Sequence, residues 1–200
     1  YFTDIDTLNE TELNIDGSDL QYDNGYIYFR EHNNNNISRI EPEENNDAKT
    51  VVAYKSNQGA RLPYCVSENI VYYTEFDSDE TGIIYCNNLE TGEKSEISLN
   101  AGIVDFAVNG ESIYCVDYND RFFTCDLKGK NQSIIDNGQF SFIQGCDEFS
   151  IWYNVDESKT IIFDKSNAVI KEINGLASKV EIVGNNLFYC TGSGYYADTV

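Results

Sequence analysis

The chain has 200 residues, which is enough for one compact domain with its own core, and we expect a single domain over residues 1–200. Its 15 tyrosines and 11 phenylalanines, with only two prolines, favour many short strands joined by turns. The formal net charge of −21, from 34 acidic against 13 basic residues, repels phosphate backbones and anionic lipid, which argues against nucleic acid or a membrane surface as a partner.

The sequence carries no sign of a membrane-spanning segment. No apolar run approaches the ~18–20 residues that cross a bilayer, and no basic segment followed by an apolar one opens the chain, so we expect no direct membrane insertion in this segment. The chain starts at Tyr1 within a predicted strand and contains no methionine, which favours a mature or trimmed ectodomain. A cytoplasmic protein stays open as the alternative.

The first predicted strands lie at the N-terminus. Tyr1-Phe2-Thr3-Asp4, followed by Thr11-Glu12-Leu13-Asn14-Ile15-Asp16, resembles the third and fourth strands of a unit that recurs later in the chain. Residues 122–124 and 133–136 are the matching strands of such a later unit. The N-terminal copy therefore lacks its first and second strands.

One block recurs from residue 25 onwards. It consists of a turn with Gly, Asn or Glu, then an aliphatic residue and two large, mostly aromatic ones, over residues 25–29, 68–73, 110–115, 147–153 and 184–189. When one aromatic residue of each copy is taken as equivalent, the spacings are 44, 42, 38 and 36 residues. These equivalent positions are Tyr28, Tyr72, Tyr114, Trp152 and Phe188.

Each of the first four blocks is followed by two more predicted strands. The nearer strands end in acidic or amide turns and cover residues 37–42, 84–87, 123–129 and 161–164. The closing strands alternate in polarity and cover residues 49–54, 94–99, 132–136 and 169–174. A shorter apolar stretch precedes the block, as in residues 104–108 and 180–183, so each unit holds four strands in a meander.

A sheet of this kind cannot bury both faces by itself, whereas sheets arranged radially bury them against each other. Periods near 40 residues with four strands per unit are typical of a β-propeller, and we predict an all-β propeller of four-stranded antiparallel blades. We expect about five blades, the last one shared between residues 1–16 and the segment from residue 180 onwards. The alternative is a fragment of a six- or seven-bladed propeller. Helical periodicity is absent from every 11-residue window.

The blocks Tyr28-Phe29-Arg30, Tyr72-Tyr73-Thr74-Glu75 and Tyr1-Phe2-Thr3-Asp4 resemble the Tyr-Trp-Thr-Asp repeats of low-density-lipoprotein-receptor-type propellers. They are still more similar to an uncharacterised bacterial family of propeller domains in surface proteins of low-GC Gram-positive bacteria. The resemblance implies placement outside the cell or at its surface, and a binding role. It implies no catalytic residue. The four-residue block is complete only at the N-terminus, so receptor-type contacts between blades are in doubt.

Two acidic residues are candidates for chemistry at the central channel. Asp19 and Asp105 each lie nine residues before a repeat aromatic, near the start of a predicted innermost strand. If they face each other at the channel mouth, they could act as the acid and base of a glycosidase, which needs carboxyl groups roughly 5–9.5 Å apart. Pro63 and Ile143 fill the corresponding places in two other units, so capping or solvent-facing roles are the alternative.

Two loops resemble ligand sites only in part. The segment Asp77-Ser78-Asp79-Glu80-Thr81-Gly82 has oxygen ligands at alternate positions and then a glycine, as a calcium loop does. The twelfth position is Asn88 where a bidentate Glu is expected, and the flanking segments are strands, so we interpret the loop as an acidic hairpin tip. The run Asn33-Asn34-Asn35-Asn36 is interpreted as another tip. We therefore expect no metal site and no cofactor.

The six cysteines are too dilute for a disulfide scaffold and lack zinc-type spacing. Cys115 and Cys125 lie symmetrically about residues 119–120, so they could oppose one another across a hairpin and form a strained disulfide. Cys86 and Cys125 occupy the places of apolar residues in other units, which favours buried free thiols. The cysteine positions are Cys65, Cys86, Cys115, Cys125, Cys146 and Cys190.

The expected function follows from what these patterns contain. His32 is the only histidine and adjoins the asparagine tip, so a Ser-His-Asp or Cys-His mechanism would have to run entirely through this loop residue. The leading hypothesis is a non-enzymatic extracellular binding or protein-interaction module, with no catalytic residue, that holds a protein or carbohydrate ligand by loops on one propeller face. Tyrosines that lie on such a face beside Asn and Asp could stack on sugars or hold peptide segments, with structural packing as the alternative. The alternative is a glycan-active enzyme, a glycosidase or lyase, with carboxylates at the channel.

Overall fold

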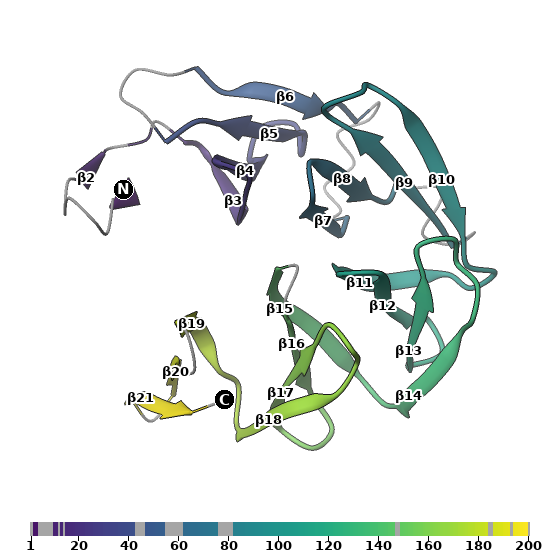
Figure 1. Cartoon of the computed structure of the whole chain (residues 1–200), viewed down its shortest axis with the longest axis vertical. Helices are drawn as coiled ribbons and strands as arrows, with labels where there is room; N and C mark the ends of the chain where they lie inside the picture. Colours follow the sequence, from purple (N-terminus) through teal and green to yellow (C-terminus); the bar gives the residue numbers. More distant parts are fainter. Residues whose placement is uncertain are drawn as a thin grey trace.

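The computed structural model describes residues 2–3, 10–11, 13, 15–42, 47–54, 62–75, 82–146, 149–183, 186–192 and 194–199. Over these residues the fold is all-β, and its strands form antiparallel sheets. Four-stranded sheets follow one another around a common centre as the blades of a β-propeller (Figure 1). The predicted fold class is confirmed.

Each blade is a meander whose strands run from the centre outwards in chain order (Figure 1). Blade 1 contains β3 (Gly17–Asp23), β4 (Tyr26–Glu31), β5 (Ile37–Ile40) and β6 (Lys49–Val52). Blade 2 contains β7 (Tyr64–Ser67), β8 (Ile70–Tyr73), β9 (Ile83–Asn88) and β10 (Lys94–Ser98). Blade 3 contains β11 (Ile103–Asn109), β12 (Ser112–Asp117), β13 (Arg121–Asp126) and β14 (Ser133–Asn137). Blade 4 contains β15 (Phe140–Cys146), β16 (Phe149–Asn154), β17 (Lys159–Asp164) and β18 (Val169–Asn174).

The ends of the chain do not share a blade in the way the sequence predicted. The C-terminal sheet, blade 5, has three strands, β19 (Ser178–Val183), β20 (Asn186–Thr191) and β21 (Gly194–Thr199). At the N-terminus, β1 (Phe2–Thr3) and β2 (Glu10–Thr11) pair only with each other among the described strands. The reason is that β21 pairs along β20 and takes the third-strand position that residues 1–4 were expected to fill. Residues 4–9, 12 and 14 lie outside the described residues.

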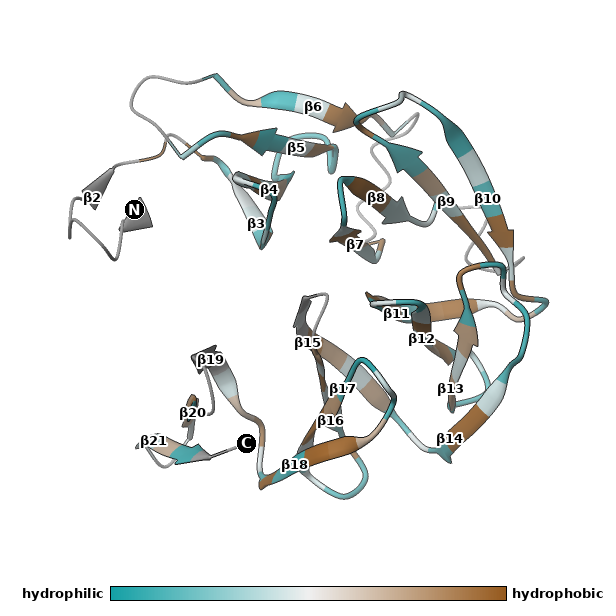
Figure 2. Ribbon diagram, viewed as in Figure 1, coloured by the Kyte–Doolittle hydropathy of each residue, from teal (hydrophilic) through white to brown (hydrophobic). Residues whose placement is uncertain are grey.

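The middle strands bury both faces, each against a different neighbouring blade. Tyr28 packs in the core between blades 1 and 2, and Tyr72 in the core between blades 2 and 3. Tyr114 packs between blades 3 and 4, and Ile151 between blades 4 and 5. The repeated residue therefore always faces the next blade, and Figure 2 shows the hydrophobic residues along β8, β12 and β16 that form these cores.

The predicted equivalence of Trp152 with these residues is wrong by one position. Counted from the two-residue turn before each second strand, Ile151 stands in β16 where Tyr114 stands in β12. Trp152 points to the opposite face and packs in the core between blades 3 and 4, because a shift of one residue moves a side chain to the other side of the sheet. The corrected spacings are 44, 42, 37 and 37 residues.

Acidic turns close the third strands of two blades, as the sequence predicted. Asp126 accepts hydrogen bonds from two backbone N–H groups of the turn that follows it, at 2.9 Å each, and Asp164 accepts two at 2.8 and 3.0 Å. The backbone N–H of Lys130 holds the pKa of the Asp126 carboxyl below its usual value, and the Ser166 hydroxyl does the same to the pKa of Asp164. These carboxylates stabilise the turns and are not free for chemistry.

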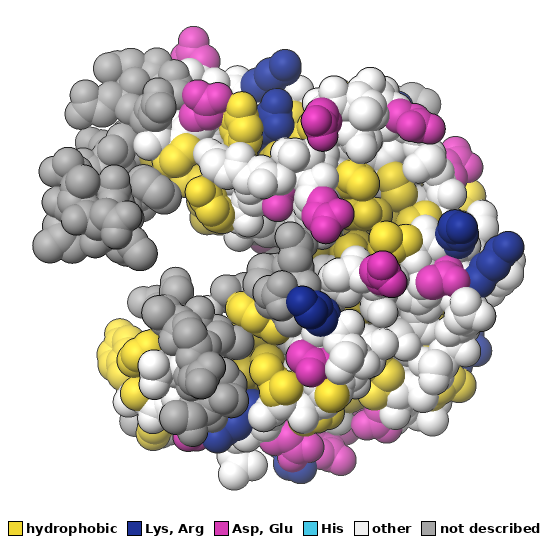
Figure 3. Space-filling view, viewed as in Figure 1, with side chains coloured by type: hydrophobic (Ala, Val, Ile, Leu, Met, Phe, Trp, Pro, Cys, Tyr) yellow, Lys and Arg dark blue, Asp and Glu magenta, His cyan; other side chains and the backbone are white. Residues whose placement is uncertain are grey.

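The two ends of the arc differ in how they are covered. Leu13 and Ile15 lie against a small core on blade 1 that contains Phe29. On blade 5, Phe188 is 45% exposed and Tyr195 is 81% exposed. Figure 3 shows hydrophobic side chains gathered at this end of the molecule. Among the described residues, blade 5 thus packs one face against blade 4 and exposes apolar side chains on the other.

Candidate functional site

The innermost strands of the blades surround the centre of the ring, and the two predicted channel carboxylates lie on them. Asp19 belongs to β3 and Asp105 to β11 (Figure 1). Both residues sit at irregularities in the pairing of these strands with β4 and β12. Of the residues that fill the corresponding places, Pro63 lies just before β7 and Ile143 packs against the core between blades 4 and 5.

Asp19 is engaged by a buried arginine. Its carboxylate accepts a hydrogen bond from Arg30 Nε at 3.1 Å, and its backbone carbonyl accepts one from the Tyr64 hydroxyl. The Arg30 side chain is almost fully buried and also donates to the carbonyls of Asn35, at 3.2 Å, and Leu62. Asp19 adopts a left-handed backbone conformation, with φ of 55°, which presents its carbonyl and carboxylate to this cluster. Asp19 and Arg30 therefore connect blade 1 to blade 2, because Leu62 lies just before the first strand of blade 2 and Tyr64 begins that strand.

Asp105 also connects two blades. Its carboxylate accepts a hydrogen bond from the backbone N–H of Phe142 in β15 at 3.0 Å, and a second from its own neighbour Phe106 at 3.0 Å. Gln21 makes the same kind of connection between blades 1 and 2, donating to the Tyr64 carbonyl at 3.0 Å and accepting from the Val66 N–H at 2.9 Å. Both residues therefore pair backbone groups of the next innermost strand.

The predicted calcium-like loop falls mostly on residues 76–81, which lie outside the described residues. Gly82 is described, and its backbone has φ of 70°. In the part of the chain that the structure describes, no group of three or more His, Cys, Asp or Glu side chains is arranged to hold a metal ion. That same part contains no helix with the length and hydropathy to cross a membrane.

The asparagine run is a hairpin tip between β4 and β5, as predicted. Asn34 donates to the Glu31 carboxylate at 2.7 Å and accepts from the Asn36 backbone N–H at 2.8 Å, so its side chain stabilises the tip. His32, beside it, is exposed, and its Nδ1 lies 2.8 Å from a carboxylate oxygen of Asp16. Histidine and carboxylate form a surface pair at this tip.

The cysteines of blades 2 and 3 gather in one core. Cys65, Cys86, Cys115 and Cys125 are buried free thiols within the hydrophobic cluster between these blades, and Cys190 is a half-buried free thiol. The predicted opposition of Cys115 and Cys125 is wrong, because β12 and β13 pair Cys115 with Phe123 and Cys125 with Ile113. The hairpin turns one residue earlier than the symmetry of the two cysteines suggests. The side chain of Cys146 lies outside the described residues.

We expect labelling with a bulky maleimide to separate the five described thiols. Among them, Cys190 should react first in the folded protein, while the four buried thiols stay unmodified over the time that saturates it. Burial raises the pKa of Cys86 to about 11 and the pKa of Cys115 well above its usual value, so reactive thiolate is scarce at neutral pH. Mass spectrometry of the labelled peptides measures each site, and in Cys190→Ser the four buried thiols should stay unmodified as before. Fewer than six reactive thiols after denaturation without reductant would reveal a disulfide and contradict this prediction.

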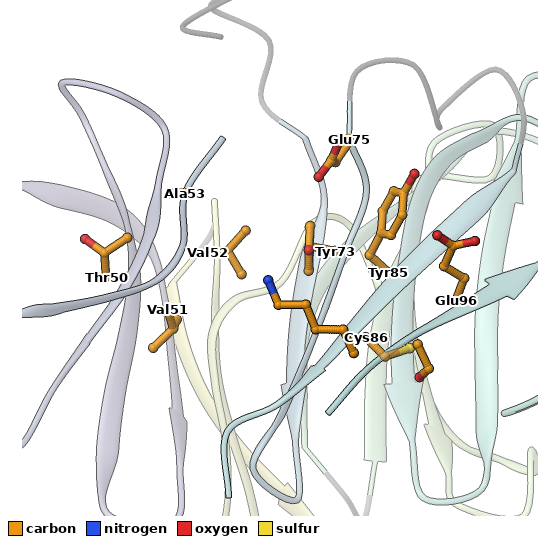
Figure 4. A pocket seen from close by; sticks show the side chains of 11 residues that line it. Thr50, Val51, Val52, Ala53, Tyr73, Glu75, Tyr85, Cys86 and Glu96 are labelled. Carbon is orange, nitrogen blue, oxygen red and sulfur yellow. The ribbon is translucent and has the colours of Figure 1, made fainter. Parts of the chain in front are cut away.

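A pocket of about 660 Å³ opens between the outer parts of blades 1 and 2. Tyr73 of β8 lies opposite Tyr85 of β9, and Tyr85 lies opposite Glu96 of β10, so the three side chains form a row across three strands of blade 2. Figure 4 shows Val51 and Val52 of β6 on the other side of the pocket. We call this pocket the interblade groove; its lining comprises Thr50, Val51, Val52, Ala53, Tyr73, Glu75, Tyr85, Cys86, Lys94, Ser95 and Glu96.

Aromatic rings make up the floor of the interblade groove. The rings of Tyr73 and Tyr85 are stacked, with centroids 5.6 Å apart and an angle of 28° between their planes. The ring of Tyr54 packs edge-on against that of Tyr73, with centroids 6.0 Å apart. Tyr73 is buried and Tyr85 is half-buried, so the stack has a fixed inner ring and an outer ring that reaches the groove.

Two carboxylates flank the stacked rings. Figure 4 shows Glu75 and Glu96 on either side of Tyr85 at the rim. Burial raises the pKa of Tyr73 to about 12, and the negative charges of Glu75 and Glu96 add to the shift. Lys94 is the single basic residue of the lining. The groove can therefore hold a ligand by an aromatic face and by carboxylate acceptors at its edge.

Sequence reasoning anticipated the use of tyrosines but did not find this groove. The sequence placed Tyr73 and Tyr85 in neighbouring predicted strands of one unit, over residues 68–73 and 84–87. The register that places Tyr73 opposite Tyr85 belongs to the pairing of β8 with β9, which the residue pattern did not specify. Glu75 was noted only as the last residue of the block Tyr72-Tyr73-Thr74-Glu75, and Glu96 only as part of a closing strand over residues 94–99, so neither was assigned to a site.

Comparison with known proteins finds structural neighbours but no sequence relatives. No protein-family model matches the chain, and no curated protein matches it in sequence. PorZ, a bacterial surface component of the type-IX secretion system of Porphyromonas gingivalis, is similar with a TM-score of 0.64 and 13% identity. The alignment covers 96% of this chain and 25% of the PorZ chain, so this chain spans about a quarter of that protein.

Two further neighbours have different functions. The structure of a nidogen/laminin complex contains a chain similar with a TM-score of 0.59 and 13% identity, over 92% of this chain and 73% of that one. Virginiamycin B lyase from Staphylococcus aureus is similar with a TM-score of 0.52 and 15% identity, over 90% and 69% of the two chains. At these identities the similarity establishes the propeller fold alone.

Proposed function

We propose that this propeller is a non-enzymatic binding module that acts outside the cell and recognises a protein partner through the interblade groove. The observation that carries the proposal is the stacked pair of Tyr73 and Tyr85, set in a pocket of about 660 Å³ with carboxylates at its rim. Tyrosines supply large contact area at a low cost in side-chain entropy, which is why they are enriched where proteins bind each other.

The fold supports a binding role because the groove is built on paired strands. Its aromatic row lies on β8, β9 and β10, which hold the rings in place before a partner arrives. A preformed site of this kind loses little conformational freedom on binding. The acidic surface, with a net charge of −21, adds attraction for a basic partner and speeds its approach.

The residues considered for catalysis have structural partners in the described part of the chain. Asp19 holds Arg30, and Asp105 holds the backbone of β15. His32 pairs with Asp16 on an exposed tip. The glycan-active alternative would need two carboxylates released from such partners and facing one another across a pocket. No described residue provides a specific observation in its favour.

The structural neighbours lend support to a role in protein contact and surface placement. PorZ is a bacterial surface component, and the second neighbour is a chain of a nidogen/laminin complex. The lyase shows that the same fold can carry an enzyme, so its similarity by itself favours neither the binding module nor the glycan-active enzyme. A surface-exposed protein-binding propeller is consistent with the acidic, tyrosine-rich composition.

Photo-crosslinking tests the proposal. The crosslinking amino acid p-benzoylphenylalanine is placed at Thr50 in the groove, or at exposed Ile135 on blade 3 as the control, and each protein is exposed to surface extracts of the cells that produce it. We expect one protein, identified by mass spectrometry and then purified, to crosslink saturably from position 50 and not from position 135. Crosslinking to glycan instead, equal capture from both positions, or turnover of glycan, ester or peptide substrates by the purified propeller would overturn the proposal.

A further inference from the structure

The chain holds one of its own arginines on a tyrosine face next to a carboxylate. The guanidinium of Arg39 lies 4.1 Å over the centre of the Tyr26 ring. The hydroxyl of the same tyrosine donates a hydrogen bond to the Glu41 carboxylate at 2.8 Å. The ring face attracts the cation and the carboxylate adds negative potential beside it.

The buried arginine of blade 1 is held by the same combination. The guanidinium of Arg30 lies 5.2 Å from the centre of the Tyr64 ring and donates to the Asp19 carboxylate at 3.1 Å. Arginine suits this combination because its planar group stacks on a ring while its edge donates to a carboxylate. Two sites on one chain therefore show the arrangement that an arginine adopts on this scaffold.

The interblade groove presents the same two chemical groups at the surface. Glu96 lies directly opposite Tyr85 on the neighbouring strand, and Figure 4 shows Glu75 on the other side of that ring. Tyr73 stacks beneath Tyr85 and fixes its orientation. The pocket in front of these groups, about 660 Å³, has room for a long side chain and part of the backbone that carries it.

We propose that the interblade groove binds an arginine side chain of the partner polypeptide, with the guanidinium stacked on Tyr85 and hydrogen-bonded to Glu96 or Glu75. This assignment rests on the proposed function and narrows its ligand. The two carboxylates outnumber Lys94 in the lining, and the chain as a whole carries −21, so a cationic ligand is favoured over an anionic one. Arginine is favoured over lysine because its guanidinium is less strongly hydrated and offers a flat face to the ring.

Titration with a single-residue probe tests the assignment on the whole chain. N-acetyl-L-arginine amide is added to isotope-labelled protein, and the amide and tyrosine-ring signals are followed by NMR. We expect saturable shifts at Tyr73, Tyr85 and the amides of β6, with binding that weakens as salt is raised. N-acetyl-L-citrulline amide, which has nearly the same shape and no charge, should bind about tenfold more weakly or not at all. The lysine compound should bind more weakly than the arginine compound.

Substitutions in the groove supply matched controls. Glu96→Gln and Tyr85→Leu should each weaken arginine binding about five- to tenfold. Glu93→Gln makes the same change of charge on the exposed turn before β10 and should leave binding unchanged. Because Glu93 and Glu96 are both exposed, neither substitution to Gln should disturb the fold, and unchanged amide signals elsewhere would verify this.

Three results would overturn the assignment. They are equal binding of citrulline and arginine, equal binding of lysine and arginine, and equal weakening by Glu93→Gln and Glu96→Gln. If crosslinking from Thr50 identifies a protein partner while citrulline matches arginine, the proposed function stands and the arginine assignment falls. If arginine binds as expected and no protein is captured, the groove chemistry stands and the proposed function falls.

Discussion

Replacing Trp152 with alanine is expected to remove about 3–5 kcal/mol from the free energy of unfolding. Trp152 is fully buried between blades 3 and 4, where its ring lies 4.9 Å from that of Phe122 and 5.2 Å from that of Phe142. The substitution leaves a large cavity at the centre of an aromatic cluster, and the facing sheets cannot close around it without breaking their own pairing. A domain of this size has roughly 5–15 kcal/mol to lose, so partial unfolding at 37 °C is expected.

Urea denaturation followed by circular dichroism measures the effect, because Trp152 is the only tryptophan and its fluorescence is lost in the variant. Trp152→Phe should cost much less. It keeps most of the ring contact and removes an indole N–H that has no hydrogen-bond partner among the described residues. Tyr118→Ala, at a residue that is 57% exposed, is the control and should change stability by less than about 0.5 kcal/mol. A loss below about 1 kcal/mol for Trp152→Ala would contradict the packing described.

Arg30→Ala is expected to cost about 3–5 kcal/mol, because removing one partner of a buried ion pair leaves the other charge without compensation. The guanidinium holds the Asp19 carboxylate and the carbonyls of Asn35 and Leu62, so its loss also leaves two backbone acceptors without this donor. It further removes the cation from the face of Tyr64. The contact between blade 1 and the entry of blade 2 should weaken as a result.

A double-mutant cycle separates the ion pair from the rest of the cluster. Asp19→Asn keeps a residue that tolerates the left-handed backbone, and Arg30→Met keeps most of the buried volume. The double variant should be more stable than the sum of the single losses predicts, by about 1–3 kcal/mol. Lys128→Ala, at an exposed turn, is the control. Additive losses, or a strong dependence of the Arg30→Ala effect on salt, would indicate an exposed pair and contradict the burial described.

The burial of the blade strands explains why the repeat could be found in the sequence while the exact alignment of its copies could not. Strands that bury both faces read as continuous apolar runs, so alternation gives no clue to which side a residue takes. In blade 4 the aliphatic Ile151 stands where other blades have an aromatic residue, and matching by residue type selected its neighbour Trp152. The symmetry of Cys115 and Cys125 about residues 119–120 suggested that they could lie opposite one another, but the hairpin turns one residue earlier and pairs each with a different residue.

The candidate site was even less accessible from sequence. Tyr73, Tyr85 and Glu96 are far enough apart in the chain that only the pairing of β8, β9 and β10 brings them into one row. Arg30 was part of the repeat block, with no sign that it would be buried or that Asp19 would be its partner. Whether a polar residue such as Arg30 is buried with a partner depends on how two blades pack against each other. That packing exists only in the folded protein.

The amino-acid sequence by itself determined the strands, their grouping into four-stranded units and the propeller, because turn residues and apolar runs recur at a period that each blade must satisfy locally. The tertiary structure alone decided which face each residue takes, which strand follows β20 and how blades 1 and 2 meet. Those outcomes depend on contacts between residues distant in the chain, where several registers bury similar apolar area. The interblade groove belongs to this second class, since no blade contains it alone and it exists only where β6 lies beside β8, β9 and β10.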